Sequence, residues 1–143
     1  PNSFVIHRLG ELELEAHCTP GHTPGHMTFI GEGVVISGDC MFLGRCGRTD
    51  LFGGDANAQR QSLVHLRARL NGLPNDWLVL PGHLYQLADG SNPTYITVEK
   101  LLMDNEALAA LDDDKEWNSL EFLAFDDDLA EKARRERARA QRE

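Results

Sequence analysis

The chain has 143 residues, of which 41% are hydrophobic and 26% charged, and a formal net charge of −9 at pH 7. This length fits one small domain or half of a larger one, and the apolar content excludes a wholly disordered chain. The acidic balance argues against nucleic-acid binding, and no apolar run is long enough to cross a membrane. Three cysteines without a CxxC motif argue against a disulfide scaffold, so we expect a reducing, cytoplasmic location.

The first forty residues predict strands and a hairpin. Residues 11–17 alternate between apolar and polar side chains, which is typical of a strand with one wet face. Residues 27–30 and 34–37 are apolar runs separated by Gly-Glu-Gly, which predicts a hairpin with a tight turn. The second of these strands ends just before Asp39.

The middle of the chain predicts a loop followed by helix, strand and helix. Residues 40–54 form a glycine-rich loop, and a loop of this length is usually functional. Asp55 is a suitable N-cap for a helix over 56–70. A short strand over 77–80 and a second helix over 97–111 follow. The order of these elements predicts an α/β fold with helices packed on a mixed sheet.

After residue 111 the composition changes, so we divide the chain into residues 1–111 and a C-terminal extension, 112–143. Aspartate triplets at 112–114 and 126–128 bracket an apolar stretch, and the tail beyond them is basic and rich in alanine. The triplets lack the ligand spacing of a calcium loop, and we interpret them as helix caps and solvated charge. The tail predicts a terminal helix.

Three short motifs carry residues of metal-site type. His22 lies in TPGHTPGH, Asp39 in ISGDC and His83 in LPGH, each at the point where a strand gives way to a loop. Imidazole nitrogens and carboxylate oxygens are ligands for Zn²⁺ and for non-haem iron. Together the three residues predict part of a metal site.

These motifs, with CGRTDLFGGD between the second and the third, resemble the C-terminal half of a metallo-β-lactamase-fold enzyme. The resemblance covers about residues 11–110 and is strongest to the branch that holds glyoxalase II-type thioester hydrolases and glutathione persulfide dioxygenases. It implies half of an αββα sandwich. The N-terminal signature HxHxDH of this fold does not occur here. We therefore expect a piece of a longer protein, inactive by itself and completed by the missing N-terminal half, with a homodimer also open.

The resemblance implies roles for the motif residues. His22 would bind a first metal, Asp39 would bind the same ion or bridge two, and His83 would bind the second. In a hydrolase with one or two zinc ions, a metal-held hydroxide would attack a glutathione-type thioester, with Asp39 catalytic. In a persulfide dioxygenase with one iron, His22 and Asp39 would be ligands and His83 would lie nearby without binding metal. A third hypothesis is a non-catalytic binding module.

Two further residues are candidates for binding the small thiol-derived substrate. Arg48 suits a bidentate contact with a glutathione carboxylate, and its alternative role is a salt bridge to Asp50 or Asp39. Tyr85 follows His83 closely and would either cover the substrate or pack against Trp77.

The remaining histidines and the cysteines have no supporting motif. We interpret His26 as structural, and His17 and His65 as ordinary surface or edge residues. Thiolate ligation by Cys18 or Cys40 is the less favoured alternative to small buried side chains.

Overall fold

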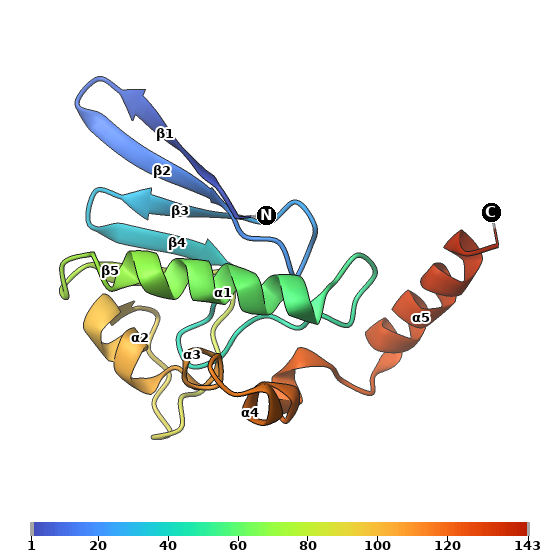
Figure 1. The fold of residues 1–143 in the computed structure, drawn as a ribbon. Coiled ribbons are helices and arrows are strands. Elements are labelled where there is room, and N and C mark those ends of the chain that lie inside the picture. Colours follow the sequence, from blue (N-terminus) through green and yellow to red (C-terminus); the bar gives the residue numbers. More distant parts are fainter. Residues whose placement is uncertain (1, 143) are drawn as a thin grey trace.

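A computed structural model describes residues 2–142 and shows one six-stranded sheet with helices packed against it (Figure 1). The strands are β1 (Phe4–Leu9), β2 (Leu12–Cys18), β3 (Met27–Gly31), β4 (Val34–Gly38), β5 (Leu78–Pro81) and β6 (Ile96–Thr97). The helices are α1 (Ala56–Leu70), α2 (Val98–Asp104), α3 (Glu106–Ala109), α4 (Asp114–Asn118), the 3₁₀ turn η1 (Glu121–Leu123) and α5 (Asp128–Ala140).

The strands lie in the sheet in their sequence order, and only β4 and β5 are parallel neighbours. The mixed sheet with helices is therefore confirmed. Because β4 and β5 run the same way, joined through α1, their carboxyl ends meet at one edge of the sheet. The predicted β3–β4 hairpin is present, and its turn residues Glu32 and Gly33 have φ angles of 51° and 83°. Positive φ at both turn residues is the geometry of the tight turns that match strand twist.

The predicted first helix is confirmed as α1. The Asp55 side chain caps it by accepting a hydrogen bond from the Ala58 backbone N–H at 2.9 Å. Its buried side chains at 63, 66 and 70 recur with helical spacing and join Ile30, Val35 and Val79 of the sheet in one core. This core holds α1 against the face of the sheet that contains Ile30, Val35 and Val79.

The prediction of one helix over 97–111 is wrong, because the helix breaks at Asn105 into α2 and α3. Asn105 has an extended ψ of 119°, and its side chain caps α3 by accepting from the Leu108 N–H at 3.0 Å. Its amide also donates to Phe42 and Arg45 carbonyls of the glycine-rich loop. The break thus ties the helices to the loop beside the carboxyl ends of the strands.

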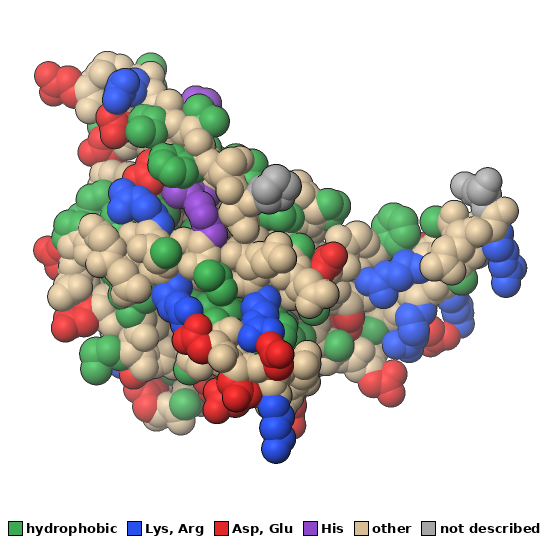
Figure 2. Space-filling model, viewed as in Figure 1, with side chains coloured by type: hydrophobic (Ala, Val, Ile, Leu, Met, Phe, Trp, Pro, Cys, Tyr) green, Lys and Arg blue, Asp and Glu red, His purple; other side chains and the backbone are tan. Residues whose placement is uncertain are grey.

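The first part of the C-terminal extension packs against the rest of the chain, while α5 extends away from the sheet (Figure 1). Trp117 of α4 is buried in the main core, and the Thr49 backbone N–H donates to the Leu123 carbonyl at 2.8 Å. The predicted capping role of the aspartates is confirmed, since Asp113 caps α4 and Asp127 caps α5. Figure 2 shows basic side chains against acidic ones below α1, and further basic side chains along α5. None of the helices in residues 2–142 is both long and apolar enough to cross a membrane.

The alternation in β2 suggests that its glutamates face solvent and its leucines face the core, but the structure shows the opposite arrangement at Glu15 and Leu12. Glu15 pairs in register with Ile30, so the Glu15 side faces α1, while Leu12 and Leu14 lie on the opposite side of the sheet. Leu12 is 56% exposed, whereas Ile30 is fully buried. The leucines of β2 therefore belong to a sheet face that no described helix covers.

Candidate functional site

Three loops at the carboxyl edge of the sheet bring His22, Asp39 and His83 together. His22 lies in the β2–β3 loop, Asp39 follows β4, and His83 follows β5. The His22 Nε2 lies 3.5 Å from Asp39 Oδ2, and the His83 Nδ1 lies 2.5 Å from Asp39 Oδ1. The parallel pairing of β4 and β5 is the direct cause, since it places the two loops that follow them side by side.

The His22 ring is oriented by the backbone of the glycine-rich loop. Its Nδ1 lies 2.7 Å from the Arg48 carbonyl oxygen, which can only accept a hydrogen bond. The proton of the neutral ring is therefore on Nδ1, and Nε2 faces Asp39 with its lone pair available. Metal-binding histidines usually show this arrangement, in which the second ring nitrogen donates to a carbonyl or carboxylate.

Asp39 is positioned by His26, which confirms a structural role for that histidine. The Asp39 backbone N–H donates to His26 Nε2 at 3.1 Å, and His26 Nδ1 lies 2.9 Å from the Thr19 hydroxyl. Burial lowers the pKa of His26, the opposing influence of the Asp39 charge being smaller. A neutral ring suits this contact, because an imidazolium would have no nitrogen able to accept the backbone N–H.

Gln59 is a positioning residue that the sequence analysis missed. It is fully buried on α1, its Oε1 accepts from the His22 backbone N–H at 3.2 Å, and its Nε2 donates to the Cys40 carbonyl at 2.6 Å. One side chain thus ties the His22 loop to the loop that follows Asp39. A signal was available, because Gln59 stands one helical turn before Leu63 on the apolar stripe of α1.

A glycine allows β5 to end next to the Asp39 carboxylate. A Cβ atom at Gly82 would lie 2.6 Å from Asp39 Oδ1 and 2.9 Å from the Gly38 carbonyl carbon. Contacts this short force a shift of the backbone, so the Pro-Gly-His motif has a steric reason for its glycine.

The spacing of His22 and Asp39 fits two ligands of one ion. Two ligands of a tetrahedral zinc, each about 2.1 Å from the metal, lie about 3.4 Å apart. The 3.5 Å between His22 Nε2 and Asp39 Oδ2 matches this separation. The His83 contact with Asp39 has hydrogen-bond length instead, and no group of three His, Cys, Asp or Glu side chains in residues 2–142 has the arrangement of a complete metal site. The distances therefore fit two ligands of one ion, His22 and Asp39, with His83 adjacent.

A cavity of about 300 Å³ opens beside these three residues. Its size is at the lower end of the range for small-molecule sites. Its other walls are aromatic and basic, and the C-terminal extension supplies part of them. They include Phe42, Arg45, Arg48, Tyr85, Phe122, Phe125 and Leu129.

The guanidinium of Arg48 is held by two carboxylates. Arg48 donates to Asp50 at 2.6 and 2.8 Å and to Asp127 at 2.8 and 2.9 Å. The hydrogen bonds that Arg48 donates to Asp50 and, next in size, to Asp127 raise the pKa of Arg48, and its hydrogen bonds to Asp127 lower the pKa of that carboxyl to about 2. The salt bridge to Asp50 predicted as the alternative role is present, and it also ties the C-terminal extension to the site. The substrate-binding role of Arg48 stays a prediction.

Tyr85 lies on the cavity wall. Its ring centroid is 5.1 Å from that of Phe42, and the guanidinium of Arg45 lies 4.6 Å above it. Its ring therefore packs on these two side chains, both in the glycine-rich loop. This position agrees with the predicted substrate contact, which stays a prediction.

The thiols of the loop are buried structural groups. Cys40 and Cys46 are 0% and 1% exposed, and all three cysteines are free. Burial raises the pKa of both buried thiols, that of Cys46 to about 12. The interpretation as a small buried side chain is confirmed for Cys40, whereas Cys18 is only partly buried.

The interpretation of His17 as a surface or edge residue is wrong. Its side chain is fully buried, with Nδ1 2.8 Å from His65 Nε2 and Nε2 2.9 Å from Glu15 Oε1. Glu15 in turn accepts two hydrogen bonds from Arg69. The histidine is buried because α1 covers this side of β2, which the alternation alone does not indicate.

Comparison with known proteins gives a consistent assignment. A family model described as "Metallo-beta-lactamase superfamily" matches residues 3–83. A probable metallo-hydrolase, YqgX, of Bacillus subtilis is 43% identical over 77 residues, which are 52% of this chain and 35% of YqgX. A hydroxyacylglutathione hydrolase of Halorhodospira halophila is 47% identical over 82 residues, 57% of this chain and 29% of that enzyme. The chain spans about a third of the length of such relatives.

Solved structures extend the match to the fold. ETHE1 from Myxococcus xanthus superposes with a TM-score of 0.65 and 25% identity, covering 90% of this chain and 54% of ETHE1. TTHA1623, solved in a di-iron-bound form, superposes with a TM-score of 0.52 and 33% identity over 69% of this chain and 43% of TTHA1623. The mixed sheet, the meeting of three motif residues at its carboxyl edge and the family match over more than half of the chain lead to one conclusion: the chain belongs to the metallo-β-lactamase superfamily.

Proposed function

We propose that this chain is part of a metal-dependent hydrolase acting on a glutathione-type thioester. The observation that carries the proposal is the meeting of His22 and Asp39 at the separation of two ligands, with His83 against the same carboxylate. The relatives named hydroxyacylglutathione hydrolase support the substrate class, since one of them is 47% identical over the matched residues.

In this proposal His22 Nε2 and Asp39 Oδ2 hold the metal, zinc in our preferred version. A bound divalent ion would polarise the thioester carbonyl and make a water acidic enough to attack it at neutral pH. Asp39 also accepts a hydrogen bond from His83 Nδ1, which fixes the ring and leaves Nε2 as its basic atom. His83 is 63% exposed, so this atom is accessible to a proton from solvent or substrate.

The walls of the 300 Å³ cavity would exclude water from the thioester. Three phenylalanines, Phe42, Phe122 and Phe125, line it together with the polar residues. Two of these belong to the C-terminal extension, which the Arg48 to Asp127 ion pair holds in place. An apolar wall beside a charged site strengthens the electrostatic contacts to the reacting carbonyl.

A single-iron persulfide dioxygenase is the second candidate. The hydrogen-bond length of the contact between His83 and Asp39 supports it. In this arrangement His22 and Asp39 are two members of a facial triad, and His83 binds no metal. The di-iron form of TTHA1623 supports the two-metal arrangement instead, with iron as the alternative to zinc.

We also propose that another portion of the same fold covers the open face of the sheet, the face that no described helix covers, and completes the metal site. The exposure of apolar side chains on this face supports the proposal. Val5, Leu9 and Leu12 on this face are 61%, 79% and 56% exposed. A contiguous apolar sheet face is rarely left in water, and the matched relatives are about three times as long as the matched segment. A non-catalytic binding module is the alternative.

Metal analysis tests the function. The full-length protein is purified anaerobically as wild type, Asp39→Ala, His83→Ala and the control Asp76→Ala, which changes an exposed aspartate in the loop before β5. Metal content, thioester hydrolysis and persulfide oxidation by dioxygen are measured. We expect one or two zinc ions in wild type and control, loss of the first metal in Asp39→Ala, and strongly reduced hydrolysis in His83→Ala. One iron per chain, with persulfide oxidation that is preserved in His83→Ala, would establish the dioxygenase. Full metal occupancy in Asp39→Ala would refute the assigned site.

A further inference from the structure

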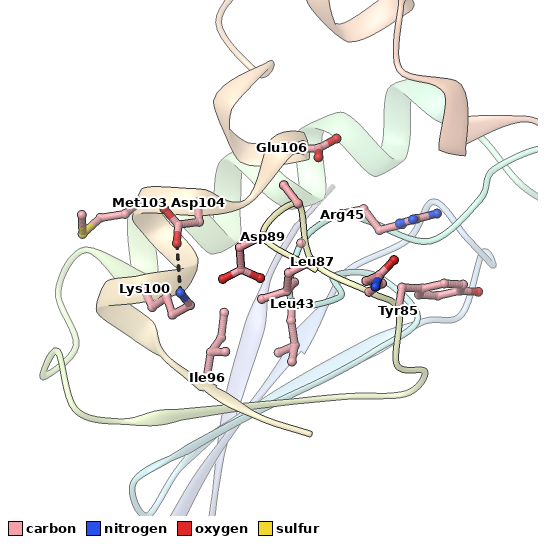
Figure 3. Close-up of a pocket in the computed structure, with 13 residues that line it drawn as sticks. Leu43, Arg45, Tyr85, Leu87, Asp89, Ile96, Lys100, Met103, Asp104 and Glu106 are labelled. Carbon is pink, nitrogen blue, oxygen red and sulfur yellow. Dashed lines mark ion pairs between the residues drawn. The ribbon is translucent and has the colours of Figure 1, made fainter. Parts of the chain in front are cut away.

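Arg45 lies where two cavities meet. A second cavity, of about 440 Å³, adjoins the one beside His22 and Asp39, and Arg45 and Tyr85 line both. Figure 3 shows these two side chains together at one end of the second cavity, with Lys100, Asp89 and Asp104 toward the other. A ligand reacting at Asp39 can therefore extend past Arg45 into the second cavity.

The guanidinium of Arg45 has no ion-pair partner within residues 2–142, in contrast to Arg48, whose carboxylate partners are Asp50 and Asp127. Two aromatic rings hold Arg45 instead, that of Tyr85 at 4.6 Å and that of Phe122 at 5.6 Å. Its backbone is fixed as well, because its carbonyl accepts from the Phe42 N–H at 2.8 Å.

An arginine held by rings presents the edge of its guanidinium to a ligand. Stacking uses the planar faces, while the N–H groups point outward in the plane and match the two oxygens of a carboxylate. Because the ring contacts and the backbone already restrict the side chain, little conformational entropy remains to be lost on binding.

The far end of the second cavity has the opposite character. Asp89 and Asp104 line it, and the lysine there, Lys100, lies 3.4 Å from Asp104. This end repels a second carboxylate and attracts an ammonium group. The two ends together suit a ligand that carries a carboxylate and an ammonium group a short distance apart.

We propose that Arg45 binds a carboxylate of the thiol half of the substrate, and that the second cavity takes the amino-acid end of that half. The inference deepens the proposed function and rests on it for the thioester. It assigns substrate recognition to Arg45, while Arg48 secures the C-terminal extension.

Calorimetric titration of the metal-loaded full-length protein tests this inference. The probes are S-methylglutathione and its diethyl ester, which lacks both free carboxylates. The variants are Arg45→Gln, Arg45→Lys and the control Arg8→Gln, which changes an arginine 70% exposed on β1. Charged hydrogen bonds contribute about 1.5–3 kcal/mol, so we expect Arg45→Gln to bind S-methylglutathione about 10- to 150-fold more weakly. The lysine variant should recover part of this loss, and the control should match the wild type.

The ester decides whether the effect belongs to the carboxylate. Wild type should bind the ester more weakly than the acid, and Arg45→Gln should bind the two alike. Equal losses for both probes, no loss for the acid, or no binding of the acid by wild type would each overturn the assignment. Hydrolysis is measured separately. If the protein hydrolyses the thioester but binding of S-methylglutathione does not depend on Arg45, this inference alone is refuted. If binding depends on Arg45 but the thioester is not hydrolysed, the proposed hydrolase alone is refuted.

Discussion

The two faces of the sheet are built from similar side chains but differ in what covers them. On the covered face, one row across the strands comprises Ile6, Glu15, Ile30, Val35 and Val79. On the open face, the adjacent row comprises Val5, Ala16, Phe29, Ile36 and Leu80. Where α1 packs, Ile30 and Val35 are fully buried, whereas Val5 and Ile36 of the open row are 61% and 42% exposed. The covered row ends at Ile6 of β1, which is 43% exposed, and in the open row the small Ala16 is buried.

This difference shows that burial depends on the covering elements and cannot be read from apolarity alone. The open row is as apolar as the covered one, which even contains the charged Glu15. Glu15 is accommodated because Arg69 of α1 donates two hydrogen bonds to it, at 2.8 and 2.6 Å. Buried charge is tolerated where it is paired, and an apolar side chain remains exposed where nothing covers it.

The largest expected effect is the difference in stability between two variants, each with one isoleucine from one face replaced by alanine. Ile30→Ala removes a fully buried side chain, and we expect it to lower the free energy of unfolding by about 2–5 kcal/mol. Ile36→Ala makes the same chemical change on the open face and should cost less than about 1 kcal/mol. Urea denaturation of both variants measures the difference. Similar losses would show that the open face is buried in solution.

The second prediction concerns the charged residue of the covered row. Arg69→Met leaves Glu15 and the buried His17 without their cation, so we expect a loss of about 1–3 kcal/mol in the free energy of unfolding. The matched control is Arg8→Met, whose partner Glu13 is about half exposed, and it should cost at most about 1 kcal/mol. Equal effects of the two variants would contradict a role for burial.

The pH dependence gives an independent measure of the same contact. The hydrogen bonds from Arg69 lower the pKa of Glu15 from its ordinary value of 4.5. The unfolded chain therefore binds the proton at higher pH than the folded one, and the stabilisation is complete above pH 4.5 and lost as the pH falls below it. Stability of Glu15→Gln measured between pH 6 and pH 3 should lack this component. An unchanged pH profile would show that the Glu15 pKa is not lowered.

Much of the fold was predictable because it depends on local patterns. The β3–β4 turn, the Asp55 cap and the stripe of leucines on α1 each have a short-range cause, and all three are confirmed. The break at Asn105 was not predictable, because it depends on contacts with carbonyls of the glycine-rich loop some 60 residues earlier in the chain. Which side of β2 is covered was not predictable for the same reason, since it depends on where α1 packs.

The candidate site divides in a similar way. The motifs around His22, Asp39 and His83 are visible in the sequence, and the structure brings the three residues together. The side chains that hold them were harder to find, since Gln59 acts from α1 on two separate loops. The ion pair between Arg48 and Asp127 joins positions 79 residues apart. Contacts across such separations follow from the assembled fold, and no local pattern indicates them.

The smallest expected effect is on the open face itself. The double change Val5→Lys and Ile36→Lys introduces charge into the row that no described element covers. If this face is open in the isolated chain, the free energy of unfolding should change by less than about 1 kcal/mol, because lysine stems lie along apolar surface with the charge in water. Binding of a hydrophobic dye should fall. Within the longer protein, where we propose that this face is covered, the same change should cost several times more. A large loss in the isolated chain, together with a dimer in sedimentation that the lysines dissociate, would show instead that a second copy covers the face.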